Sequence, residues 1–300
     1  MKKILLILSI LNINFCFAQF EDKEIKINKY VHGTLCQPSE TTETAALIIA
    51  GSGPTDRDGN NPMLQNHSLE MLAHGLAENN IASYRYDKRI FRMQELQFTE
   101  ADLSFDNFIE DAITALQYLK DSLHYNKIVV IGHSQGSLVG MIAAKDRASG
   151  FISLAGPSEK MSTKLIEQIS NQSAAYGDTT KVYFQQLHEK DTIEKVNPFL
   201  MSIFRPSVQH FIKTWDKYEP KKELKKLDIP ILIVNGNKDI QINVHDAEGL
   251  KSVVSDAELL LLENMNHILK SEAETKKNEE GELIVHPDLI PALTKFIQEL

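Results

Sequence analysis

The stretch Ile128-Val129-Val130-Ile131-Gly132-His133-Ser134-Gln135-Gly136 decides the fold of this chain. Its four leading apolar residues predict a strand buried on both faces, as in a parallel sheet, and the small residues from Leu138 to Ala144 predict a helix. The turn between them has the pattern G-x-S-x-G, in the strand–turn–helix context that a nucleophilic serine requires. Such a turn holds the serine in a strained backbone conformation at the carboxyl edge of the sheet. The stretch therefore predicts that Ser134 is a nucleophile; the alternative is a plain glycine-rich turn.

Strand-like and helix-like patterns alternate along the rest of the chain. Short apolar runs have the character of buried strands, and residues 24–28 alternate polar and apolar like an antiparallel strand with one solvated face. Helical spacing occurs over 66–79, over 105–120 and from near Pro287 onward. Strands that alternate with helices predict an α/β fold with a mostly parallel central sheet and helices on both faces. The apolar runs are residues 45–50, 81–86, 128–131, 151–154, 231–234 and 259–262.

Residues 157–228 break this alternation. They contain no convincing strand, but they carry helical spacing and several aromatic side chains. An insertion of this size between two strands predicts a helical cap over a core made of residues 19–156 and 229–300. Apolar side chains are dense over 197–218, where some must pack the cap and the others would line a pocket above Ser134. The expected pocket residues are Phe204 and Trp215.

Asp239 and His267 complete the expected catalytic group. A serine hydroxyl is a poor nucleophile until a base takes its proton and a carboxylate orients that base. In elbows of this kind the chain order is serine, acid, histidine. Asp239 follows the strand predicted at 231–234, and His267 follows the strand predicted at 259–262, so both should lie at the sheet edge that carries Ser134. The rival side chains are His245, Asp246 and His286, which are expected near helix starts.

The glycine-rich segment Gly51-Ser52-Gly53-Pro54 follows the strand predicted at 45–50. Acyl transfer needs two backbone N–H groups directed at the oxygen that becomes negative in the transition state. Gln135, the residue after the nucleophile, is expected to supply one of them. We expect Ser52 to supply the other, because the glycines beside it permit close approach of the chain; a simple turn is the alternative.

Composition limits the partners that the chain can hold. Of its 300 residues, 32 are Lys or Arg and 41 are Asp or Glu, and the formal charge of −9 argues against nucleic acid as a partner. The ten histidines show no metal-ligand spacing such as H-E-x-x-H, so neither a metal nor another cofactor is expected. The two cysteines cannot form a disulfide framework, and Cys36 is expected to be a packed thiol rather than a nucleophile. No pattern indicates the oligomeric state.

Residues 1–18 have the features of a signal peptide. Two lysines precede an apolar run over 4–11, and the small residues Cys16 and Ala18 stand where a cleavage site requires them. The stretch is short for a membrane span. We therefore expect a secreted or periplasmic protein, with no stable membrane insertion after cleavage. A buried first strand or an uncleaved anchor is the alternative.

Together these features resemble the α/β-hydrolase superfamily over nearly the whole chain after residue 18. Four segments are similar, more narrowly, to a group of bacterial capped serine carboxylesterases. This resemblance implies a cap over the sheet and hydrolysis of short acyl esters. Ala50, where many members have histidine, and Ile90, where many have glycine, depart from the pattern without touching the expected triad. The four segments are 51–60, 84–89, 204–206 and 264–267.

The cluster Asp56-Arg57-Asp58 lies in the first of these segments and has two interpretations. It could bind substrate, or it could be a salt-bridged loop that holds the oxyanion turn in place, which is the interpretation that we favour.

The expected function is that of an exported serine esterase that forms an acyl-enzyme on Ser134 from a small-molecule ester. The same triad serves peptidases, amidases and acyltransferases, so these stay open as alternatives. Serine at the elbow excludes enzymes that use an aspartate nucleophile there, such as dehalogenases. A ligand-binding protein with an idle triad is a further alternative from another class.

Overall fold

An eight-stranded sheet forms the centre of the computed structural model, which describes residues 20–272 and 283–300. The predicted signal peptide, residues 1–18, lies outside the described residues. The strand order is β1-β2-β4-β3-β5-β6-β7-β8; β1 and β2 pair antiparallel at one edge, β2 also pairs antiparallel with β4, and the remaining neighbours pair parallel. The expected mostly parallel sheet is therefore confirmed. The strands are β1 Phe20–Lys26, β2 His32–Pro38, β3 Thr44–Ile49, β4 Ala82–Asp87, β5 Lys127–His133, β6 Gly150–Leu154, β7 Ile231–Gly236 and β8 Glu258–Leu262.

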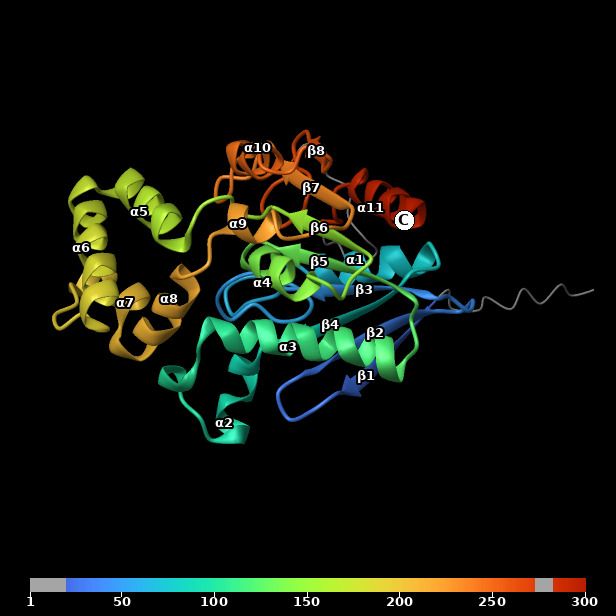
Figure 1. The fold of residues 1–300 in the computed structure, drawn as a ribbon, viewed down its shortest axis with the longest axis horizontal. Coiled ribbons are helices and arrows are strands. Elements are labelled where there is room, and N and C mark those ends of the chain that lie inside the picture. Colours follow the sequence, from blue (N-terminus) through green and yellow to red (C-terminus); the bar gives the residue numbers. More distant parts are fainter. Residues whose placement is uncertain (1–19, 273–282) are drawn as a thin grey trace, which may run out of the picture.

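Helices cover both faces of the sheet (Figure 1). On β3, Ala45, Leu47 and Ile49 belong to one buried core, and Ala46 and Ile48 belong to the other. Because successive side chains of a strand point to opposite faces, a strand covered on both sides must be apolar throughout. The first core contains α3 (Phe105–Gln117), α4 (Gln135–Ala144) and α10 (Val244–Lys251), and the second contains α1 (Ser68–Glu78) and α11 (Leu289–Glu299).

The first strand begins earlier than the sequence pattern indicates. The alternation at 24–28 predicts a strand there, whereas β1 spans Phe20–Lys26 and pairs along its whole length with β2. β1 is the edge strand, and most of its side chains are exposed. Phe20 packs on the second core, but the four residues after it are charged and exposed, so the start of this edge strand shows no alternation.

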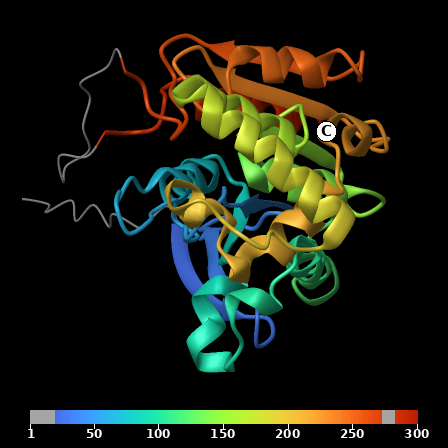
Figure 2. The same ribbon diagram turned by 90° about the vertical axis from the view of Figure 1, so that its left-hand side faces the viewer.

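Of the helices between β6 and β7, α5 to α8 project from one end of the sheet (Figure 1) and lie in front of it in the view of Figure 2. Residues 157–228 contain no strand, and their helices are α5 Met161–Gln172, α6 Ala174–Lys190, α7 Met201–Phe204, α8 Gln209–Asp216 and α9 Pro220–Leu224. α5 to α8 surround a separate apolar core, which we call the cap core. The cap core consists of Ile169, Tyr183, Phe184, Leu187, Ile193, Leu200, Phe204 and Ile212.

Two features of the cap differ from expectation. Phe204 is fully buried in the cap core, between Tyr183 and Phe184, and does not line a cavity at Ser134. The expected pocket role of Phe204 is therefore wrong, because the cap needs a large side chain at its own centre. In addition, α9 packs on α4 through Leu224, which belongs to a core of the sheet.

None of the helices in residues 20–272 and 283–300 is both long and apolar enough to cross a membrane.

Candidate active site

Ser134 occupies the sharp turn between β5 and α4, with φ 54° and ψ −120°. Few residues other than glycine adopt a positive φ, so this backbone is strained and is held by its surroundings. The Ser134 N–H donates to the carbonyl of Leu154 on β6 (2.9 Å). A Cβ at Gly132 would lie 2.3 Å from the carbonyl oxygen of Gly136, and a Cβ at Gly136 would lie 2.3 Å from that of Ile49. Both glycines of the pattern are thus required for strand and helix to pass.

His267 and Asp239 form a close pair. Nδ1 of His267 lies 2.7 Å from Oδ2 of Asp239. The other carboxylate oxygen accepts the N–H groups of Gln241 (2.8 Å) and Ile242 (2.9 Å), in the loop that follows β7. The side chain of Asp239 is 0% exposed and that of His267 is 11% exposed. The loop therefore fixes the carboxylate, the carboxylate fixes the Nδ1–H tautomer of the imidazole, and Nε2 is left as a base.

The elbow also contacts the loop that carries His267. Nε2 of His133 donates to the backbone carbonyl of His267 (2.8 Å), and the two rings lie 5.0 Å apart. In the described part of the chain, Ser134 Oγ makes no direct hydrogen bond to His267. Such bonds are often long without substrate and shorten when it binds. The structure thus brings Ser134, His267 and Asp239 to one edge of the sheet in the expected order.

The two expected oxyanion donors belong to segments that border Ser134. Gln135 is the buried first residue of α4, where backbone N–H groups have no partner within the helix and the helix dipole is positive. Ser52 is exposed in the loop after β3. The preceding residue is in tight contact with the nucleophile, since a Cβ at Gly51 would lie 3.2 Å from Cβ of Ser134.

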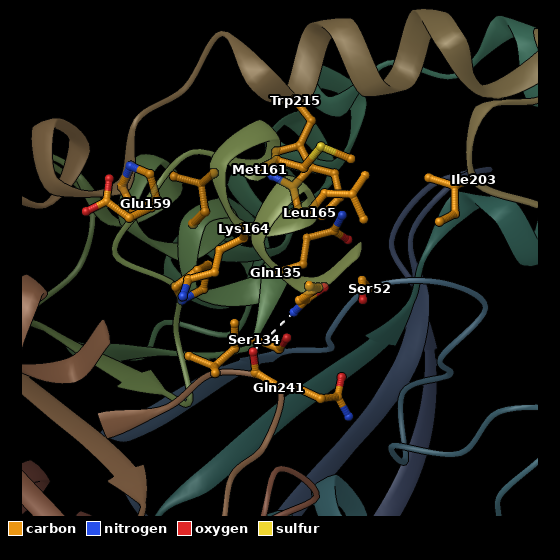
Figure 3. Close-up of a pocket in the computed structure, with 15 residues that line it drawn as sticks. Ser52, Ser134, Gln135, Glu159, Met161, Lys164, Leu165, Ile203, Trp215 and Gln241 are labelled. Atoms are coloured by element: carbon orange, nitrogen blue, oxygen red, sulfur yellow. Dashed lines mark hydrogen bonds between the residues drawn. The ribbon is translucent and has the colours of Figure 1, made fainter. Parts of the chain in front are cut away.

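A cavity of about 220 Å³ opens above Ser134 (Figure 3). Side chains of the elbow, of the cap and of the loop after β7 surround it. Polar groups on its wall include Glu159, Lys164, Gln168 and Gln241.

A second cavity, of about 330 Å³, adjoins the first and shares Ser52, Gln135 and Trp215 with it. Its wall is mostly apolar. Its polar side consists of Arg205 of the cap and Glu100, whose Oε2 accepts from Nε of Arg205 (2.8 Å). The apolar side chains are Ile90, Phe91, Met93, Leu103, Phe108, Val208 and Phe211.

The rival catalytic residues make other contacts. The side chain of His245 is 84% exposed and pairs with Glu248. Asp246 is buried, accepts from the N–H and hydroxyl of Ser158 (3.0 Å each), and pairs with Lys164 (2.8 Å). These side chains are not hydrogen-bonded to Ser134. His286 donates to the carbonyl of Glu263 (3.0 Å).

The Asp56-Arg57-Asp58 cluster forms ion pairs with the sheet. Arg57 donates to Asp87 (2.7 and 3.0 Å) and to Glu24 (2.6 Å), and Asp58 accepts from Arg85 (2.6 Å). These contacts agree with a salt-bridged loop rather than with a substrate-binding cluster.

The ligand atoms of Asp22, Cys36 and His74 lie within 4.8 Å of one another, on β1, β2 and α1. Arg85 already pairs with Asp22 (2.9 Å), and burial raises the pKa of the Cys36 thiol, which keeps it protonated. A protonated thiol and a carboxylate paired with arginine suit a cation poorly. This group also stands apart from the triad.

One buried cation beside the site has no signal of its own in the sequence pattern. Lys88 follows β4, is 5% exposed, and donates to carbonyls of the loop that carries Ser52. What marks it in the sequence is its place within segment 84–89, which carries the family resemblance.

A protein-family model described as serine aminopeptidase, S33, matches residues 66–274. The chain belongs to this family. The matched range contains Ser134, Asp239 and His267, and membership confirms the expected place in the α/β-hydrolase superfamily.

Esterases of known sequence or structure are similar to this chain along most of its length. Esterase EstD of Thermotoga maritima is 26% identical over 266 residues, which cover 84% of this chain. The chain spans 61% of the length of that relative. The solved structure of Est1E from Butyrivibrio proteoclasticus superposes with a TM-score of 0.58 at 15% identity, covering 93% of this chain and 96% of that one. The Pyrococcus furiosus esterase Pf2001 gives a TM-score of 0.56 at 14% identity, with 94% and 91% covered. These structural similarities concern the fold.

Proposed function

We propose that this protein is an exported serine carboxylesterase that hydrolyses short acyl esters of small molecules. The observation that carries the proposal is the buried Asp239–His267 pair beside the strained Ser134. The similarity to Esterase EstD supports an ester as the substrate.

The residues of the site have distinct roles in this proposal. Ser134 Oγ attacks the ester carbonyl carbon while Nε2 of His267 accepts the hydroxyl proton, and Asp239 stabilises the imidazolium that forms. The N–H groups of Ser52 and Gln135 donate to the carbonyl oxygen as it becomes negative. His267 then gives this proton to the alcohol oxygen as the ester C–O bond breaks. The alcohol leaves, and the acyl group stays on Ser134 as an ester. A water deprotonated by His267 then releases the carboxylic acid and restores the serine.

The two cavities support a substrate with two different arms. They meet at Ser52 and Gln135, where the reacting carbonyl would lie. One arm then enters the polar cavity of about 220 Å³, and the other enters the apolar cavity of about 330 Å³. Each methylene buried in the apolar cavity contributes roughly 0.8 kcal/mol, so an ester with one short apolar arm suits this site.

Nitrophenyl acetate, butyrate and octanoate test activity and chain length together. We expect the wild type to hydrolyse the shorter esters and to react covalently with a fluorophosphonate, and Ser134→Ala to do neither while remaining folded. Fluorophosphonate labelling without ester hydrolysis would point to another acyl substrate. Hydrolysis retained in Ser134→Ala would reject the nucleophile.

The family description makes an aminopeptidase the second candidate. An aminopeptidase needs a carboxylate that is free to bind the substrate ammonium. The carboxylates of described residues that line the two cavities are Glu159, paired with Lys221, and Glu100, paired with Arg205. These pairings favour the esterase. Turnover of an aminoacyl naphthylamide faster than that of nitrophenyl butyrate would reverse this preference.

Export forms part of the proposal and has a test of its own. The charged and apolar pattern of residues 1–18 supports it. Amino-terminal sequencing of protein recovered from the periplasm or medium should begin at Gln19. Recovery of the uncut chain from the cytoplasm alone would contradict export but not the esterase.

A further inference from the structure

Lys88 is a buried lysine that contacts the loop expected to bind the oxyanion. Its Nζ donates to the carbonyl oxygen of Gly53 (2.6 Å) and to that of Gly51. Its neighbours in the chain have other partners, since Asp87 pairs with Arg57 and Arg89 pairs with Asp111. Lys88 is therefore the member of this segment that holds the start of the loop after β3, at Gly51 and Gly53, whereas Asp87 holds the same loop further along, at Arg57.

The bond to Gly51 has a geometric consequence for the next residue. The carbonyl of residue 51 and the N–H of Ser52 belong to one peptide unit, which is planar and trans, so the two groups point in opposite directions. A carbonyl held on Lys88 therefore directs the Ser52 N–H away from the lysine. Gly51 itself lies against Ser134, since a Cβ added to this glycine would approach Cβ of the nucleophile to 3.2 Å. Nothing else in the described hydrogen-bond network anchors the Gly51 carbonyl.

Lys88 also lies near the residue expected to supply the other donor. Lys88 and Gln135 line the same small internal space, together with Tyr86 and Asp111. The side chain of Lys88 thus contacts the loop that carries Ser52 and borders the same internal space as Gln135.

We propose that Lys88 is a positioning residue for the reaction, which fixes the direction of the Ser52 N–H by holding the Gly51 and Gly53 carbonyls. The inference rests on the proposed function, because it assigns the oxyanion hole of that same site. A loop without this bond can rotate the peptide unit between residues 51 and 52, and the donor is then lost when the oxyanion forms. Removal of one such donor typically lowers kcat by about 10²–10³-fold.

The test compares Lys88→Met, Lys88→Gln and the neighbouring Arg89→Gln with the wild type. For each, kcat and KM are measured with nitrophenyl butyrate, together with Ki for an alkyl trifluoromethyl ketone, which forms an oxyanion on the serine. The melting temperature reports the fold. Arg89→Gln is the matched control because it removes a buried cation next in the chain that does not contact the loop.

We expect Lys88→Met to lower kcat about 10–100-fold with little change in KM, and to raise Ki for the ketone by a similar factor. Lys88→Gln should change both in the same direction but less, and it carries the test if Lys88→Met does not fold. Arg89→Gln should lower the melting temperature while leaving Ki unchanged. Wild-type kcat and Ki in folded Lys88 variants would overturn the inference. An inactive wild type would instead overturn the proposed function.

Discussion

His133, next to the nucleophile, donates a hydrogen bond from Nε2 to the backbone carbonyl of His267 (2.8 Å). A carbonyl only accepts, so the His133 ring carries its proton on Nε2. Burial, together with the charge of His267, lowers the pKa of His133 to about 4, so the ring is neutral near pH 7. The bond joins the turn that carries Ser134 to the loop that carries the base.

This contact predicts a role for His133 in alignment of the base. His133→Phe should lower kcat about tenfold and leave KM nearly unchanged, because the His267 loop loses an anchor and the base spends less time aligned. His133→Gln, which keeps an N–H donor, should lose less. Steady-state kinetics with nitrophenyl butyrate gives both values. Equal losses in the two variants would assign the effect to packing of the ring instead.

The strain at Ser134 predicts that glycine at this position gives a more stable protein than alanine does. Its φ of 54° and ψ of −120° suit glycine. Ser134→Gly should therefore be more stable than Ser134→Ala by about 1 kcal/mol in the free energy of unfolding, while both are inactive. Urea denaturation of the two variants measures the difference. Equal free energies of unfolding would show that the positive φ at this position costs alanine no more than glycine.

The Asp239–His267 pair predicts a large loss of kcat when Asp239 is replaced by asparagine, a side chain of the same size. Asn at position 239 keeps the size of the side chain but not two accepting oxygens, and both oxygens are used, by His267 and by the N–H groups of Gln241 and Ile242. Asp239→Asn should lower kcat on the order of 10³–10⁴-fold. His245→Ala is the control, because that side chain is exposed and should leave kcat unchanged. The double variant Asp239→Asn with His267→Ala should lose little more than the worse single variant.

Trp215 lines both cavities, which predicts an effect on substrate choice. Trp215→Ala should shift the ratio of octanoate to acetate hydrolysis several-fold while changing the rate on acetate less. Phe204→Ala provides the contrast. It should leave that ratio unchanged but lower the free energy of unfolding by roughly 3–5 kcal/mol, as expected for a fully buried aromatic side chain. The reverse pattern would exchange the roles of the two residues.

Burial of Lys88 predicts a decline in rate at alkaline pH. Burial lowers the pKa of Lys88 to about 7, and the nearby carboxylates of Asp56 and Asp87 oppose this effect. The lysine is charged below that pKa and neutral above it, and a charged donor forms the stronger hydrogen bond. In the wild type, kcat should therefore fall partially as pH rises through about 7 and beyond.

The variant Lys88→Met serves as the control for this pH profile. It should lack the alkaline decline and keep the acidic limb, which reports protonation of the base. His133, Tyr86 and the Arg89–Asp111 pair also surround this lysine. Burial keeps the pKa of His133 at about 4 and raises that of Tyr86 well above its usual value, so neither titrates in this range. A decline that persists in Lys88→Met would therefore show that Lys88 is not its source.

The central strands and the elbow could be predicted because their physical causes are local. A strand covered on both faces must be apolar, and the approach of β5 to α4 admits only glycine at positions 132 and 136. The roles of Asp239 and His267 could be predicted because the carboxyl ends of parallel strands lie at one edge of the sheet. The order serine, acid, histidine along the chain then selects these two residues.

The remaining parts depend on contacts between distant segments. The role of Lys88 arises from a loop 35 to 37 positions earlier in the sequence, and the contact of His133 with His267 spans 134 positions. No local pattern encodes such pairs. The pocket role expected of Phe204 is wrong for a related reason: an apolar run shows that side chains will be buried, but not whether they face the cap core or a cavity.

The contact between Glu100 and Arg205 joins the cap to the segment after β4 at the wall of the second cavity. One partner belongs to the segment after β4 and the other to the cap, and their side chains are 32% and 39% exposed. Ion pairs as open to water as this one contribute about 0–1 kcal/mol, and salt weakens them further. The cap core, by contrast, is apolar and is complete without this pair. Raising the ionic strength should therefore weaken this polar link, whereas the rings of Phe211 and Trp215, which pack on Phe105 of α3, still join the cap to the rest of the enzyme.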